Sequence, residues 1–254
     1  MPRDLEPLDL LDDLIGRAKR AGADAADAVF AKGTSLSLAQ RLGEPEKLER
    51  AEGQDLGLRV LVGKRQAIVS STDFKPATLD ALVERAVAMA RAVPEDPYCG
   101  IADPDQVTHQ FPALDAVDPA EPASATLIER AKRAEEAALA VPGVTNSEGA
   151  EASWSRSMSA LVASNGFAGV HEVSHHSVSA AVLAGDGTAM ERDYDYSTTV
   201  HGADLEDPAA VGKRAGERTV RRLKPRKVAT AKVPIVFDPR VAGGMLRHLA
   251  GGIS

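Results

Sequence analysis

The sequence predicts an α+β protein built from two similar units, each a helix, a set of antiparallel strands and a second helix, followed by the start of a β-rich C-terminal domain. Three observations lead to this prediction. Amphipathic helical spacing occurs repeatedly, and hydrophobic runs between the helices end at glycine-containing turns. The same order of elements also occurs twice, over about residues 8–92 and 124–223. This order indicates a duplication whose two sheets join or stack, with a coincidence of element order as the alternative.

The first predicted unit covers residues 1–93. Apolar residues at helical spacing predict a helix from Leu8 that ends at Gly22. Pro76 is placed to begin a second helix, whose apolar face continues to Ala90. Between these helices lie three runs typical of an antiparallel meander, at residues 28–42 with a break at Gly33, 56–62 and 66–71.

Residues 94–123 are expected to form an extended surface connector between the two units. This stretch is rich in proline and shows no sustained periodicity, which is typical of an irregular segment. Its prolines are Pro94, Pro97, Pro104, Pro112, Pro119 and Pro122.

The second predicted unit covers residues 124–225. Ser124 is expected to cap its first helix, and Asp207 and Pro208 to cap and begin its last. Asn165-Gly166 and Asp186-Gly187 are strong hairpin signals, so the segments around them are expected to be strands. The expected strands are residues 153–163, a run ending at 184, and 188–200.

Residues 226–254 are expected to begin a further domain. Val233 to Phe237 has the pattern of a buried strand, and a glycine-rich helical segment follows from Val241. The helical pattern is still running at Ser254, so we expect the front part of a longer protein. The preceding basic cluster, 218–227, is interpreted as a helix C-terminus whose cations suit the helix dipole, with phosphate binding as the alternative.

Composition excludes several classes of protein. The net charge is -7 and the isoelectric point about 5.4, which argues against direct nucleic-acid binding. The only cysteine, Cys99, allows no intrachain disulfide and favours a reducing, cytoplasmic setting. The N-terminal residues have no signal-peptide pattern, and no run of about 18 apolar residues predicts a membrane span.

His171, Glu172 and His175 spell the His-Glu-x-x-His pattern of zinc proteases. That chemistry needs a helix, because only there do residues four apart share one metal. The bracketing hairpin signals instead predict a polar strand face carrying His171, His175 and His176. The alternative that remains open is a self-sufficient zinc metalloprotease using His171, Glu172 and His175.

Asp193 and Asp195 alternate with Tyr194 and Tyr196 along another expected strand. The two carboxylates would share one face and the two rings the other. A functional carboxylate pair is one interpretation, and cross-strand packing is the other.

Nearly the whole chain resembles the TldD/PmbA (TldE) family, whose members are often labelled modulators of DNA gyrase. No single motif carries the resemblance, but the order and spacing of several do. They lie at residues 56–67, 70–74, 79–91, 163–167, 186–194, 233–239 and 244–246.

The resemblance implies a role in a heterodimeric metallopeptidase. The TldD branch carries His-Glu-x-x-x-His in a helix after the segment similar to 233–237. The matching positions here are Arg247, His248 and Gly252, so both histidine ligands are missing. The chain therefore resembles the PmbA/TldE branch, for which neither a catalytic nor a metal-ligating residue is expected.

The family also implies partners and a substrate class. A TldD-type partner subunit would supply zinc, and no cofactor is expected in this chain. The complex would process unfolded peptides, such as leaders of peptide antibiotics and antitoxins, while this chain helps to hold the substrate at residues that the resemblance does not define. The alternative is a regulatory protein that acts on gyrase or DNA through the basic cluster 218–227.

Overall fold

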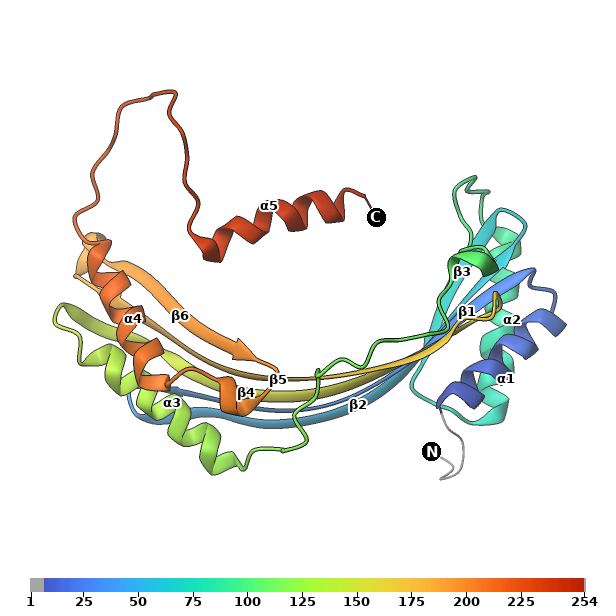
Figure 1. Cartoon of the computed structure of the whole chain (residues 1–254), viewed down its shortest axis with the longest axis horizontal. Coiled ribbons are helices and arrows are strands. Elements are labelled where there is room, and N and C mark those ends of the chain that lie inside the picture. Colours follow the sequence, from blue (N-terminus) through green and yellow to red (C-terminus); the bar gives the residue numbers. More distant parts are fainter. Residues whose placement is uncertain (1–6, 254) are drawn as a thin grey trace. The chain divides into compact units, whose positions relative to one another are not determined.

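The computed structural model describes residues 7–253, which fall into two compact units that divide after Leu223. An antiparallel sheet runs through the first unit in the order β3-β2-β1-β4-β5-β6 (Figure 1). The strands are β1 (Ala25–Arg41), β2 (Glu44–Val62), β3 (Arg65–Ser71), β4 (Val144–Ala163), β5 (Ala168–Ala184) and β6 (Glu191–Thr199). The two halves of the unit meet where β1 pairs with β4, so their strands form one sheet.

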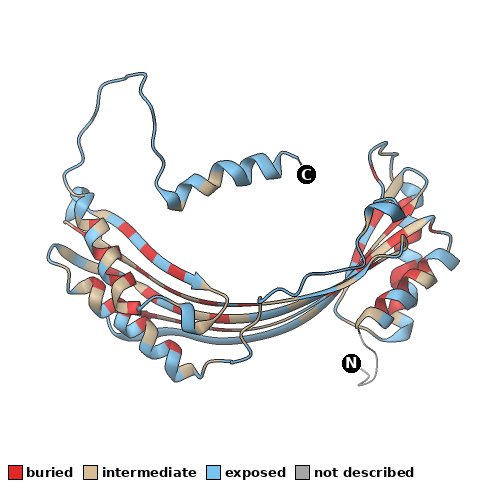
Figure 2. Ribbon diagram, viewed as in Figure 1, coloured by how far each residue is buried: buried red, intermediate tan, exposed pale blue. Residues whose placement is uncertain are grey.

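Two pairs of helices pack on the same face of this curved sheet, at its opposite ends (Figure 1). The pair α1 (Pro7–Arg20) and α2 (Pro76–Ala92) covers one end, and α3 (Ser124–Leu139) and α4 (Pro208–Arg221) covers the other. Buried strand residues alternate with exposed ones, as expected when helices cover one face only (Figure 2).

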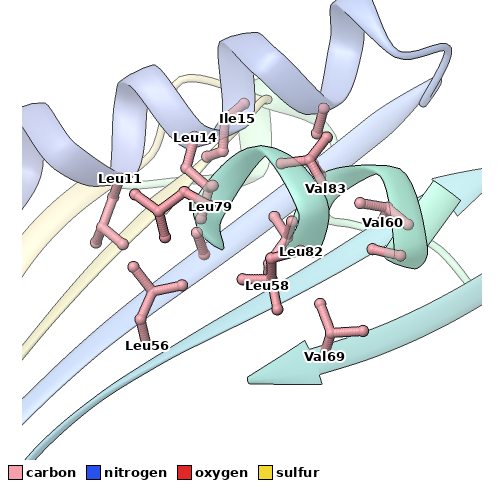
Figure 3. Close-up of a cluster of buried hydrophobic side chains, with 14 of the residues drawn as sticks. Leu11, Leu14, Ile15, Leu56, Leu58, Val60, Val69, Leu79, Leu82 and Val83 are labelled. Atoms are coloured by element: carbon pink, nitrogen blue, oxygen red, sulfur yellow. The ribbon is translucent and has the colours of Figure 1, made fainter. Parts of the chain in front are cut away.

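Each helix pair closes its own hydrophobic core. The core under α1 and α2 is aliphatic and includes Leu11, Leu58 and Leu82, which point toward one another between helices and strands (Figure 3). The core under α3 and α4 is built mainly of alanine, valine and leucine with Trp154. Small side chains let α3 and α4 approach closely, and Gly212 faces the backbone of Ala134 at their crossing.

The α+β class predicted from the sequence is confirmed, with several local differences. Strand β1 runs through Gly33 without the expected break, because its neighbours β2 and β4 pair with it on both sides of that residue. Ser124 is the first residue of α3, and Ala123 occupies the N-cap without a side-chain hydrogen bond. Gly166 has the expected positive φ of 94°, and the Asp207 side chain accepts a hydrogen bond from the Ala209 amide.

In the second unit, residues 224–254, the strand expected at Val233 to Phe237 was a wrong prediction. This segment is irregular, and Val236 is 96% exposed. An apolar run becomes a strand only when a neighbouring strand supplies backbone partners, and none of the described strands pairs with it. The expected helix does form, as α5 (Pro239–Gly251), with Asp238 as its N-cap. The domain limits proposed from the sequence stay predictions.

None of the helices in residues 7–253 combines the length and apolar character needed to cross a bilayer.

Candidate functional site

The sheet face opposite the helices of the first unit is polar and rich in small side chains. Trp154 and its cross-strand neighbour His176 both point to the helix side. The residues on either side of them in β4 and β5 therefore point to the opposite face, because side chains alternate along a strand. Serine, histidine and tyrosine side chains dominate the opposite face: Ser35, Ser37, Ser153, Ser155, Ser157, Ser159, His171, His175, Tyr194 and Tyr196. Such a surface offers many hydrogen-bond donors and acceptors to a polar or peptide ligand.

The His-Glu-x-x-His residues lie on strand β5, as the hairpin signals predicted. His171 and His175 are four residues apart along a strand, about 13 Å, so their imidazoles cannot bind one metal ion. Glu172 points to the other face, where its carboxylate is 2.9 Å from Arg156 Nη2. Among residues 7–253, no group of three or more histidine, cysteine, aspartate or glutamate side chains is arranged to hold a metal. The helix required by the self-sufficient protease alternative is therefore not formed here.

His176 was wrongly predicted to share the polar face with His171 and His175. It is one residue further along the strand, so it points to the helix side, where it is only 2% exposed. Its Nε2 lies 3.1 Å from the Asp118 carboxylate of the connector. No local pattern predicts this contact, because it joins residues 58 positions apart in the chain.

Asp118 attaches the connector to β5 and to the segment between β6 and α4, through His176 and Gly202. Its carboxylate accepts hydrogen bonds from the backbone amides of Gly202 (2.8 Å) and Ala120 (2.9 Å). These bonds lower the pKa of Asp118. Burial lowers the pKa of His176, and the neighbouring Arg130 guanidinium adds to this effect while Asp118 opposes it.

These shifts predict that the first unit loses stability as the pH falls below about 6.5, the ordinary pKa of histidine. The sign follows because the unfolded chain takes up a proton on His176 that the native state resists. Asp118 adds a second loss at lower pH, since its stabilising contribution disappears once the carboxylate is protonated. Thermal unfolding of wild type and His176→Gln between pH 8 and 5 checks this, with a flatter profile expected for the variant. Equal slopes for the two proteins would contradict it.

Two arginines of the basic cluster, Arg218 and Arg222, form ion pairs within the first unit. Asp195, which is 4% exposed, binds Arg214 Nε at 2.6 Å and also pairs with Arg218. Arg222 lies 3.4 Å from Glu191. Arg218 and Arg221 lie in the last turn of α4, as the helix-dipole interpretation expects, and the ion pairs of Arg218 and Arg222 attach α4 and its C-cap to β6.

Strand alternation in β6 also follows the sequence prediction. Asp195 faces arginines of α4 and Asp193 faces the C-cap residue Arg222, so the two carboxylates form packing ion pairs and not an exposed carboxylate pair. Tyr194 and Tyr196 lie on the opposite face with stacked rings 6.3 Å apart.

The positions matching the family's zinc motif lie on α5 and its C-cap. His248 is in the last turn, Arg247 directly precedes that turn, and Gly252 is the C-cap residue. Arginine is a permanent cation and glycine has no side chain, so this set offers a single imidazole. A zinc site of the His-Glu-x-x-x-His type does not fit these residues, since it needs two histidines.

Comparison with known protein families gives two adjacent matches. Residues 26–90 match the PmbA/TldA metallopeptidase domain 1, and residues 117–223 match the PmbA/TldA metallopeptidase central domain. The chain belongs to the PmbA/TldD family. The two halves of its continuous sheet thus correspond to the family's domain 1 and central domain.

Curated relatives extend the match. The chain is 36% identical over 233 residues to the metalloprotease PmbA of Escherichia coli O157:H7, covering 91% of this chain and 52% of that protein. It is 33% identical over 238 residues to the metalloprotease PmbA homologue of Haemophilus influenzae, covering 93% of this chain and 52% of that one. The chain therefore spans about half the length of the curated relatives it matches.

Solved structures share the fold. A protein from Bacteroides thetaiotaomicron, described as a candidate modulator of DNA gyrase, superposes with a TM-score of 0.87 at 24% identity, over 96% of this chain and 56% of that one. TldE from Thermococcus kodakarensis superposes with a TM-score of 0.70 at 15% identity, over 84% of this chain and 47% of that one.

Proposed function

We propose that this PmbA/TldD-family chain belongs to a non-catalytic, PmbA/TldE-type subunit of a cytoplasmic zinc metallopeptidase complex. In this proposal a TldD-type partner binds the zinc and the two subunits form a heterodimer. The substrates are unfolded peptides, such as peptide-antibiotic leaders and antitoxins. The single cysteine supports the reducing compartment.

One observation carries the proposal. Arg247 and Gly252 occupy the two positions where the family's zinc motif requires histidine, and His248 occupies the position of the glutamate. A metallopeptidase needs three protein ligands and a polarised water, and neither arginine nor glycine can replace an imidazole. Catalysis by the complex would then depend on the partner's ligands.

The sheet face that carries no helices in the first unit supports the other part of the proposal, that the chain helps to hold peptide. Its side chains are mostly small or hydroxyl-bearing, so an extended backbone can approach the sheet closely. The proposed function of this surface is to bind peptide while the chemistry takes place in the partner.

A peptidase assay of the full-length protein tests this role. The protein alone is expected to leave an unfolded peptide intact, and a mixture with a TldD-type subunit is expected to cleave it. Cleavage should stop when the partner's zinc is removed. Chelator-sensitive cleavage by the full-length protein alone would contradict the proposal.

No observation favours the gyrase or DNA-associated alternative. Arg218 and Arg222 are engaged by carboxylates of β6, so these cations are not free to bind phosphate. The net charge of -7 also opposes binding to a polyanion.

A further inference from the structure

The N-terminal part of strand β5 has an open edge that is not paired with β6. Pairing between β5 and β6 ends at His176 and Thr199. Beyond that point, β5 continues from Ser174 back to Ala168 with β4 alone as its strand neighbour. A strand edge of this kind presents backbone donors and acceptors that another extended chain can bind.

The direction of these backbone groups follows from one hydrogen bond. The Ser174 amide points away from β4 and donates to the Ala116 carbonyl of the connector at 2.9 Å. Residues two and four positions earlier in a strand direct their amides to the same side. The N–H and C=O groups of Val170 and Glu172 therefore point outward, and within residues 7–253 no backbone hydrogen bond reaches them from that side.

The connector forms the second wall of a slot along this edge. It is attached at both ends of the edge, by the Ala116 bond at Ser174 and by a 2.9 Å bond from Asn165 Nδ2 to the Ala102 carbonyl. Between connector and strand lies a hollow of about 560 Å³. Its lining is mostly apolar and includes Phe111, Leu114, Leu161, Phe167 and Val170.

Two aromatic rings close the hollow at the hairpin end. Phe111 and Phe167 meet edge to face, with ring centroids 5.8 Å apart. They can do so because Gly169 has no side chain; a Cβ there would lie only 3.1 Å from the Phe111 ring. Phe111 nevertheless remains 52% exposed and Leu114 66% exposed, so much apolar surface faces the opening.

We propose that this slot binds a short extended peptide segment, which adds to the β5 edge at Val170 and Glu172 and places one apolar side chain in the hollow. The unpaired backbone groups specify an extended chain, and the aromatic wall specifies an apolar residue. The free part of this edge lies between Ala168 and the connector bond at Ser174, a length that matches a short peptide segment. In the proposed function, this slot is where the chain binds the substrate peptide. The inference rests on that function only for the source of the peptide.

Binding of a defined probe to the full-length protein without any partner subunit tests the slot. The probe is fluorescein-labelled acetyl-Ser-Phe-Thr-Leu-Ser-Lys-amide, followed by fluorescence anisotropy. The matched probe has the same side chains but carries N-methyl groups on the Thr and Ser amides. We expect saturable binding of the first probe and at least about tenfold weaker binding of the second, since a strand addition loses its hydrogen bonds.

Substitutions on the protein separate backbone from side-chain recognition. Val170→Pro removes one outward N–H while leaving the ladder to β4 intact, and an edge position tolerates proline. Phe111→Ser removes part of the apolar wall at an exposed position. Each is expected to weaken the probe about tenfold, whereas Leu48→Ser, at an exposed apolar residue of β2 outside the slot, should bind as wild type. Thermal melts confirm that each variant is folded.

Three results would overturn the site. These are absence of probe binding, equal binding of the N-methylated probe, or wild-type binding by both Val170→Pro and Phe111→Ser. Self-association that Val170→Pro abolishes, without probe binding, would show that a second copy fills the edge and would also refute the proposal. None of these results affects zinc content or cleavage by the complex, so failure of the slot is distinguishable from failure of the proposed function.

Discussion

Gly212→Ala is expected to destabilise the first unit by about 3 kcal/mol or more, an unusually large effect for one added methyl group. Gly212 lies where α4 crosses α3, and a Cβ there would be 1.9 Å from the Ala134 carbonyl oxygen and 2.7 Å from its carbonyl carbon. These are backbone atoms, so the two helices must separate to admit the methyl group. Separation would open the core between α3, α4 and the sheet.

Gly16→Ala is the matched control, because it places the same methyl group in another helix of the same unit. Its nearest neighbour is the flexible end of Arg20, at 3.3 Å, which can move aside. The control is expected to be neutral or to gain up to about 1 kcal/mol from helix propensity. Urea unfolding of wild type and both variants measures the difference. Similar free energies of unfolding for Gly212→Ala and Gly16→Ala would refute the close helix contact.

Glu135→Ala is expected to cost about 3 kcal/mol, because it removes an acceptor that satisfies several buried donors at once. Glu135 is 1% exposed, and its carboxylate accepts hydrogen bonds from the amides of Leu42 (2.7 Å) and Gly43 (3.0 Å). Gln40 Nε2 (2.9 Å) and Ser147 Oγ (2.5 Å) donate to it as well. The carboxylate thereby attaches α3 to the β1–β2 turn, where Leu42 has a positive φ of 52°.

The same site predicts a pH dependence. Burial alone would raise the pKa of Glu135, but the hydrogen bonds from Ser147, Gly43, Gln40 and Leu42 outweigh it and lower the pKa. Its stabilising contribution is therefore complete above about pH 4.5 and is lost as the pH falls through the lowered native pKa.

Glu136→Ala is the matched control for Glu135→Ala. Glu136 is an exposed neighbour whose carboxylate is 3.9 Å from Lys132, so its removal should change the free energy of unfolding by less than about 0.5 kcal/mol. Equal losses for the two variants, measured by denaturant unfolding at pH 7, would contradict the role given to Glu135.

Much of the fold could be predicted from local sequence patterns. The hairpin at Gly166 and the cap at Asp207 depend on residues that are neighbours in the chain, so their chemistry is readable directly. Strand pairing partners are not readable in this way. The joining of both halves through β1 and β4, and the unpaired state of Val233 to Phe237, depend on which distant segments meet.

The candidate site shows the same division. Strand alternation was enough to reject a shared metal at His171 and His175, but the assignment of His176 to their face overlooked that alternation. The Asp118 contact and the slot under the connector depend on where an irregular, proline-rich segment crosses the sheet. No periodicity predicts that crossing, although the large apolar residues Phe111 and Leu114 within the proline-rich connector were a signal that could have been followed.

The zinc content of the purified full-length protein tests the central claim, that this is the subunit without the metal site. Inductively coupled plasma mass spectrometry after dialysis is expected to find far less than one zinc per chain, and the triple substitution Arg247→His, His248→Glu and Gly252→His supplies a comparison in which the family's motif is restored. One zinc per chain in the wild-type protein, retained through dialysis and removed by a chelator together with peptidase activity, would contradict the account.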